Sequence, residues 1–457
     1  MPDAPEGEEL RHLVPLREAT KAWFLISLQT FGGPAGQIAV MQRTLVDERR
    51  WIGERRFLHA LSYCMLLPGP EAQQLAVYTG WLLNGGIGGV VAGVLFVLPG
   101  LLAMLALSWL YVAHGDTTLV TGLFLGLSPA VVAIVVQAVV RVGRRALGHA
   151  AMVGLAAAAF VALALLHVPF PLVVVAAGIA GWVLGRRWPA TTAAPPPVDD
   201  GGPSPVVPDD ALHHATPSWR RNTLVLGVGL VLWTAPVVLA WVLAGGQRTV
   251  LVDQGLFFGG MALVTFGGAY AVLTYVAQAA VQTYGWVTAS EMVKGLGLAE
   301  TTPGPLIMVV QFVAFLGAYR DPGGLDPWVA AVLASLLTVW VTFVPCFLFI
   351  FLGAPYVERL RGSATIASAL SGVTAAVVGV IANLALYFAI HTLFSSTATR
   401  SLGPLHVDLP VWSSYVWQAW LIAVVAAVLL LGRGWSVLRT LGLSALLGLA
   451  LTVLAPV

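Results

Sequence analysis

Glycine or proline interrupts four apolar stretches of the sequence, and polar side chains stand next to these interruptions. The interruptions, here called the first to fourth breaks, are Gly32-Gly33-Pro34, Pro68-Gly69-Pro70, Gly267-Gly268 and Pro303-Gly304-Pro305. Proline removes a backbone donor and glycine adds backbone freedom, so a helix ends at each break and another follows it. The new helices are expected to begin at Ala35, Glu71, Ala269 and Leu306.

The start of a helix can bind an anion, because its first N–H groups have no partner within the helix and its dipole is positive there. A single break could equally be a kink in a packed membrane helix. Four breaks favour an anion site, because the polar groups beside them are costly in hydrocarbon unless they line a cavity or pair. The predicted substrate-binding residues are Gly32, Gly33, Pro34, Gln37, Pro68, Gly69, Pro70, Gln73, Gln74, Gly267, Gly268, Thr301, Thr302, Pro303, Gly304, Pro305 and Gln311.

Two glutamates flank the Pro-Gly-Pro breaks. Glu71 follows the second break and Glu300 precedes the fourth. An acidic residue at membrane depth is a functional candidate, so both are predicted to carry protons. Glu71 could also simply cap its helix, since it lies in a first turn. Lys294 has two open interpretations, a substrate contact or a long side chain that reaches the membrane surface.

Five arginines stand in the short stretch between the first two breaks. They can be determinants of membrane topology, or a funnel that concentrates anions at the cytoplasmic mouth, and the two roles are compatible. The residues are Arg43, Arg49, Arg50, Arg55 and Arg56.

The composition places these residues in a membrane protein. Of 457 residues, 58% are hydrophobic and 10% are charged, against roughly a quarter charged in ordinary globular domains. Several continuous apolar runs approach the ~20 residues needed to cross a bilayer, without the alternation of a barrel strand. The predicted fold is therefore an all-α polytopic membrane protein. The net charge of +2 gives no indication of a nucleic-acid partner, and none is expected.

The chain contains an internal repeat. Phe266, Trp286 and Pro303 each lie 235 positions after their counterparts Phe31, Trp51 and Pro68. Such a constant displacement indicates duplication. A proline-rich, acidic stretch separates the copies and is predicted to be a disordered linker. The expected domains are an N-terminal repeat at 1–188, a cytoplasmic linker at 189–219 and an inverted C-terminal repeat at 220–457.

Each half is expected to start with two broken, re-entrant helices. In the first half these are 18–50 and 54–84, followed by crossings near 88–111, 118–140, 148–166 and 170–185. An extra helix at 222–244 makes the number of crossings between the copies odd, so the second copy should be inverted. The charges agree, because the arginine-rich turn at 43–56 indicates the cytoplasm, whereas 278–291 contains no Lys or Arg.

These motifs resemble the chromate ion transporter family in its long, two-domain form. The resemblance is carried by Phe31 to Gly36, Trp51, Leu67 to Gln74, Gly80, Phe96 to Pro99, Phe266 to Gly268 and Thr302 to Pro305. It implies export of chromate, with sulfate as a chemical look-alike, through the inner membrane of a prokaryote. The second copy departs from the first, with Ala269 in place of Pro34 and Leu306 in place of Glu71.

The membrane potential and the absence of certain motifs reduce the number of candidate functions. Moving a dianion out of a negative interior gains about 4.6 kcal/mol per 100 mV, so export needs no ATP. We find no phosphate-binding loop, metal-ligand spacing or cofactor fingerprint, so neither cofactor nor metal is expected, and Cys64 and Cys346 are interpreted as packed thiols. The alternatives are an oxyanion channel and a membrane-embedded enzyme, and a homodimer is left open.

Overall fold

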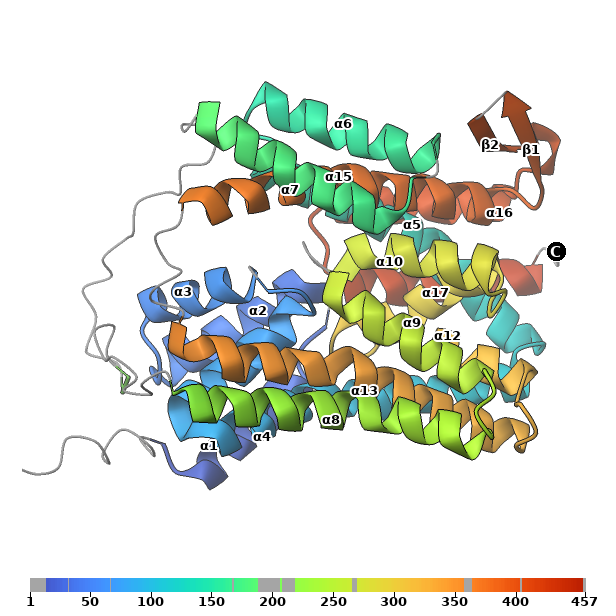
Figure 1. Cartoon of the computed structure of the whole chain (residues 1–457). Helices are drawn as coiled ribbons and strands as arrows, with labels where there is room; N and C mark the ends of the chain where they lie inside the picture. The colour runs from blue at the N-terminus through green and yellow to red at the C-terminus, as the bar shows by residue number, and fades with distance from the viewer. Residues whose placement is uncertain are drawn as a thin grey trace, which may run out of the picture.

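The protein is almost entirely helical. The computed structural model describes residues 14–31, 33–65, 67–166, 168–187, 206–207, 218–264, 269–356, 364–402 and 405–454. Seven helices in these ranges are long and apolar enough to cross a membrane. Figure 1 shows the helices lying roughly along one direction, with α3 at one end of the bundle and a small β-hairpin at the other. The predicted all-α polytopic class is confirmed.

The first half contains seven α-helices. They are α1 (Leu16–Ser27), α2 (Gly33–Gln42) with a π-helical turn at Arg43–Glu48, α3 (Glu54–Cys64), α4 (Glu71–His114), α5 (Thr118–Ala146), α6 (Ala150–Ala164) and α7 (Phe170–Arg187). Helix α4 contains the second piece of the predicted element 54–84 and the predicted crossing 88–111, and a non-helical kink separates them at the predicted boundary. At the kink Gly85 has φ 63°, and Asn84 Nδ2 donates to Val14 O at 2.6 Å.

The second half repeats this order after one additional helix, α8 (Trp219–Leu243). Its other elements are α9 (Val250–Val264), α10 (Ala269–Gln278) with a π-helical turn at Ala279–Thr283, α11 (Ala289–Thr301), a 3₁₀ turn at Leu306–Met308, α12 (Val309–Arg320), α13 (Pro327–Gly353), a 3₁₀ turn at Ala354–Tyr356, α15 (Ala364–Leu393), β1 (Thr397–Leu402), β2 (Leu405–Pro410), a 3₁₀ turn at Trp412–Ser414, α16 (Trp417–Ala427) with a π-helical turn at Val428–Gly432, and α17 (Val437–Leu454).

Helices begin directly after the breaks. Three of them start at the predicted residues Glu71, Ala269 and Leu306. The fourth, α2, starts at Gly33 rather than at the predicted Ala35. This difference has a simple cause, because a proline fits the first turn of a helix, where no N–H needs to be donated.

The two halves are interlocked through exchanged contacts. Helix α5 of the first half packs against α16 and α17, and α15 of the second half packs against α6 and α7. Glycines without room for a Cβ face each other in both places, Gly126 with Gly448 and Gly181 with Gly372. Small residues of this kind let membrane helices approach closely. Equivalent helices of the two halves thus make equivalent contacts with the opposite half.

Part of the predicted linker is held against the first half. Within 189–217 the structure describes only residues 206–207. Val206 N donates to Arg50 O at 3.1 Å and Val207 N donates to Trp51 O at 3.0 Å. Val207 is also buried, in the same apolar cluster as Ile52. These two residues therefore gain both hydrogen bonds and apolar burial on the arginine-rich turn.

Candidate functional site

The first and fourth breaks are in direct contact. Gly304 N donates to Thr30 O at 2.9 Å, and the Gln37 side-chain Nε2 donates to Gly304 O at 2.6 Å. Both groups of Gly304 are therefore satisfied by the opposite half of the chain. Residues that the sequence places 267 positions apart meet here.

Each Pro-Gly-Pro break also lies against the long helix of the opposite half. A Cβ built on Gly304 would lie 3.3 Å from Gly100 Cα in α4, and one built on Gly69 would lie 2.8 Å from Cys346 Sγ in α13. Gly100 follows Pro99 and Cys346 follows Pro345, so the two contacts are equivalent. Gly69 and Gly304 have φ of +119° and +103°, which residues with a Cβ rarely adopt.

Buried polar atoms without a protein partner gather at the second and fourth breaks. Within the described ranges they include both amide atoms of Gln73, Oε1 of Gln74, Oε1 of Gln311 and Oε2 of Glu300. The side chains of Gln73 and Gln311 are fully buried. Buried polar groups are nearly always hydrogen-bonded, and leaving one unpaired costs about 1–3 kcal/mol. A ligand with hydrogen-bonding oxygens would compensate this cost.

The N-terminus of α4 provides further donors beside Gln73. Pro70 occupies the N-cap and makes no side-chain capping bond. The first intrahelical bond of α4 runs from Gln74 N to Pro70 O, so the N–H groups of Glu71, Ala72 and Gln73 have no carbonyl partner in the helix. These N–H groups and Gln73 Nε2 can all donate to an oxyanion. Glu71 is the first residue of this helix and is partly exposed.

Two predicted site residues use their hydroxyls differently from expectation. Thr301 Oγ1 donates to Leu298 O at 2.8 Å, and Thr302 Oγ1 donates to Ala299 O at 3.0 Å. Such bonds to the preceding turn are common for threonine. In this structure these hydroxyl hydrogens therefore serve the last turn of α11.

Tyr270 was not identified from the sequence. Its Oη donates to Glu300 Oε1 at 2.6 Å, and it stands in the first turn of α10, directly after the third break. The repeat carried the only available signal, because this position corresponds to Ala35 in the first copy. The predicted residues Gly32, Gly267 and Gly268 lie outside the described residues.

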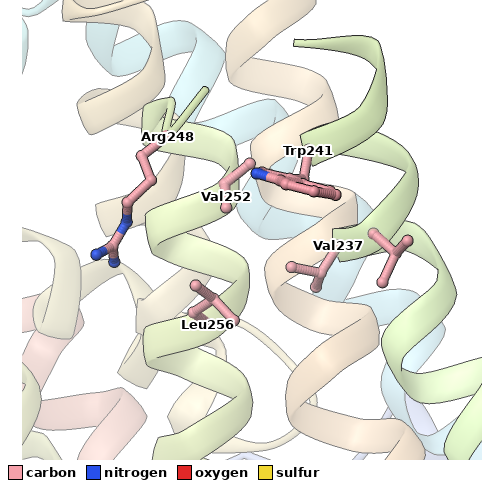
Figure 2. A pocket seen from close by; sticks show the side chains of 6 residues that line it. Val237, Trp241, Arg248, Val252 and Leu256 are labelled. Carbon is pink, nitrogen blue, oxygen red and sulfur yellow. The ribbon is translucent and has the colours of Figure 1, made fainter. Parts of the chain in front are cut away.

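The groove in Figure 2 differs from the breaks in the chemistry of its lining. It has a volume of about 380 Å³ and lies between α8 and α9, lined by Val237, Val238, Trp241, Arg248, Val252 and Leu256. Figure 2 shows the Arg248 guanidinium pointing away from Trp241 and Val237. That guanidinium pairs with Asp253 at 2.7 Å. An apolar lining with a neutralised arginine does not suit a dianion, so the breaks are the stronger candidate site.

Comparison with known proteins identifies the family. A family model described as chromate transporter matches residues 17–182 and 252–449. The chain belongs to the chromate transporter family. The resemblance seen in the motifs is thus confirmed, and the chain is a multi-pass inner-membrane protein of a transporter family. The matched ranges contain all four breaks and leave out α8 and the linker.

Relatives of the transporter span most of its length. A chromate transport protein of Pseudomonas aeruginosa is 32% identical over 426 residues, which are 91% of each chain. One from Cupriavidus metallidurans is 27% identical over 82% of each chain. A probable chromate transport protein of Synechococcus elongatus is 25% identical over 82% of this chain and 86% of its own. No solved structure is significantly similar to the transporter.

The arginine-rich turn of the transporter is less positive than its composition indicates. Arg43 forms an ion pair with Glu48 at 3.3 Å, and Arg49 forms one with Glu18 at 3.1 Å. Arg49 also lies over the ring of Trp51, 4.8 Å from its centroid. Arg55 is exposed in the first turn of α3. The predicted funnel of Arg43, Arg49, Arg50, Arg55 and Arg56 is therefore partly neutralised by acidic neighbours.

Lys294 of the transporter is held by aromatic rings. Its Nζ lies 3.5 Å from Tyr111 Oη and 5.5 and 5.6 Å from the ring centroids of Tyr111 and Phe124. A cation over aromatic faces is attracted by the ring quadrupoles. Neither of the two sequence interpretations included this aromatic contact.

Proposed function

We propose that the chain is a secondary transporter that exports chromate from the cytoplasm and holds the dianion at the helix breaks. One observation carries the proposal. Gln73 is fully buried, both of its amide atoms lack a partner among the described residues, and it stands at an uncapped helix N-terminus. The names of the relatives indicate chromate as the substrate. Sulfate, which has the same tetrahedral shape and charge, is the expected competing ligand.

The binding residues are neutral donors rather than paired cations. The N–H groups of Glu71, Ala72 and Gln73, with the Gln73 amide, form a preorganised set of donors at the positive end of a long helix. Hydrogen bonds to a charged acceptor are stronger than those between neutral groups. A site without a fixed cation also releases a dianion easily. Release matters here because the membrane potential already drives export by about 4.6 kcal/mol per 100 mV.

Glu71 and Glu300 are the proposed proton carriers. Glu71 shares the helix end that would hold the dianion, so an ionised Glu71 would repel the substrate. Binding of substrate therefore favours a protonated Glu71, which links the two ligands. If Glu71 is only a helix cap, Glu71→Gln should leave the effect of a pH gradient on chromate flux unchanged.

Flux measurements on purified protein in cofactor-free liposomes test the function. Radiolabelled chromate should accumulate with saturable kinetics, and unlabelled chromate on the opposite side should accelerate it. Sulfate should compete, and imposing or removing a pH gradient should change the rate. Flux that neither saturates nor shows this acceleration would indicate an oxyanion channel. No chromate flux from a folded, reconstituted protein would contradict the proposed function.

The inverted topology can be tested at two positions of the repeat. Asp47 and Gln282 are exposed, lie in the corresponding π-helical turns and differ by the repeat displacement. In a background without Cys64 and Cys346, Asp47→Cys should react with a membrane-impermeant thiol reagent from the cytoplasmic side. Gln282→Cys should react only from the external side. Labelling of both from one side would mean that the two halves have the same orientation.

The role of the arginines should appear as a dependence on salt. Arg55→Gln should slow chromate flux severalfold at about 0.01 M salt and little at about 0.1 M, where the Debye length falls from about 30 to about 10 Å. Arg49→Gln should have a smaller effect, because Glu18 already offsets its charge. Initial rates at the two ionic strengths check this. A salt-independent loss of chromate binding in either variant would place the dianion on the arginines instead.

A further inference from the structure

A single phenol joins three of the four breaks. Tyr270 lies in the first turn of α10, after the third break, and its Oη donates to Glu300 Oε1 at 2.6 Å just before the fourth break. A Cβ built on Gly33, at the first break, would lie 3.7 Å from the same Oη. Tyr270 therefore stands where α2, α10 and α11 meet.

The hydrogen bonds of Gly304 with Thr30 and Gln37, together with the bond between Tyr270 and Glu300, connect three breaks and are here called the clasp. Gly304 is bound to Thr30 and Gln37, which fixes the fourth break to the first. The bond between Tyr270 and Glu300 fixes the third break to the fourth. Relative movement of α10 and α11 must break the bond between Tyr270 and Glu300.

The Glu300 carboxyl is incompletely satisfied in this clasp. Only 1% of the residue is exposed, Oε1 accepts from Tyr270, and Oε2 has no protein partner among the described residues. Tyr270 and Arg141 of α5 are the titratable and charged groups that act on Glu300 within the described chain.

We propose that Tyr270 is the positioning residue of a proton-operated clasp between the breaks. Its O–H holds Oε1 of Glu300, so Oε2 is the oxygen that takes up and releases the proton. When Glu300 is ionised the bond is charge-assisted and strong, and when Oε2 carries a proton the bond becomes a weaker, neutral one. Protonation thereby loosens the contact between α10 and α11. The inference rests on the proposed function and deepens it.

The pH profile of chromate flux in liposomes tests this role. Glu300→Gln should remove the part of the pH dependence that the clasp provides. Tyr270→Phe keeps the ring but removes the donor, so the ionised carboxylate is less favoured and the pH of half-maximal flux should rise by about one unit. The double variant should behave like Glu300→Gln alone. Tyr275→Phe, on the same helix and stacked on Phe170, is the control and should leave the midpoint unchanged.

A second variant covers the case in which Tyr270→Phe does not fold. Glu300→Asp keeps the carboxyl but shortens it beyond the reach of Tyr270, and it should move the midpoint in the same direction. A uniform fall in rate with an unchanged midpoint in both variants would overturn the inference, as would a wild-type flux that is indifferent to pH. Saturable chromate flux by the wild type separates these outcomes from failure of the proposed function.

Discussion

Gln73→Leu should bind chromate about ten- to a hundredfold more weakly and yet be more stable than the wild type. The side chain is fully buried, and neither amide atom has a partner in the part of the chain that the structure describes. Replacing it with an apolar group of similar size removes an uncompensated cost of about 1–3 kcal/mol. The same change removes a donor to a charged ligand, worth about 1.5–3 kcal/mol. Thermal unfolding without ligand and equilibrium binding of labelled chromate measure the two effects.

Gln37→Leu is the matched control, because it is the same substitution at another buried glutamine beside a break. Gln37 Nε2 donates to Gly304 O, so its loss should lower the stability by leaving that carbonyl unpaired. Opposite signs of the stability change at the two glutamines are the expected result. If Gln73→Leu is destabilised like Gln37→Leu and binds chromate normally, Gln73 is a packing residue and the site lies elsewhere.

Gly69→Ala should reduce chromate transport at least tenfold while leaving insertion into the membrane nearly intact. Alanine at φ +119° costs about 1–3 kcal/mol of backbone strain. Its Cβ would also lie 2.8 Å from Cys346 Sγ and 2.9 Å from Gln74 Nε2. The second break would therefore be pushed away from α13 and from the start of α4. Gly304→Ala should act in the same direction, but with a looser contact of 3.3 Å to Gly100.

Two further variants separate the backbone strain of Gly69→Ala from its steric conflict. Gly245→Ala also places alanine at a positive φ, +64°, in the milder left-handed region, and no atom of the described residues lies within 4 Å, so transport should fall only slightly. Adding Cys346→Ala to Gly69→Ala removes the conflict with the Cys346 Sγ, while the contact with Gln74 Nε2 remains, so it should restore part of the flux. Rates of the folded, reconstituted variants decide this. Normal transport by both Gly69→Ala and Gly304→Ala would show that the breaks need no glycine and would remove the basis for a backbone site.

The positions of the breaks could be predicted because their causes are local. Glycine and proline act on their own turn, so three helix starts were predicted correctly. The fourth helix, α2, starts at Gly33, two residues before the predicted Ala35. The kink in α4 lies at the predicted boundary between 54–84 and 88–111, but the hydrogen bond from Asn84 to Val14 O, 70 residues away in the chain, was not predicted. Local sequence carries no information about such a partner.

The contacts between the site residues could not be predicted from the sequence for the same reason. A tyrosine in an apolar segment has no pattern that assigns it to Glu300, and nothing in the chain order places Cys346 beside Gly69. Thr302 shows the reverse case. Its type and position suited a substrate contact, but at a helix end its hydroxyl bonds to the preceding turn.

The exchanged contacts between the halves have a consequence for synthesis of the chain. Helix α5 ends at Ala146, and one of its principal partners, α17, begins only at Val437. At about 5–20 residues per second, roughly 15–60 s separate the two segments at the ribosome. During that interval α5 is in the bilayer with its glycine-lined face covered by lipid or by a chaperone. Helix α15 is made earlier and packs against α6, α7 and α5, so we expect the first half to mature from its last two helices backwards, with α5 fully packed only when α17 has been synthesised.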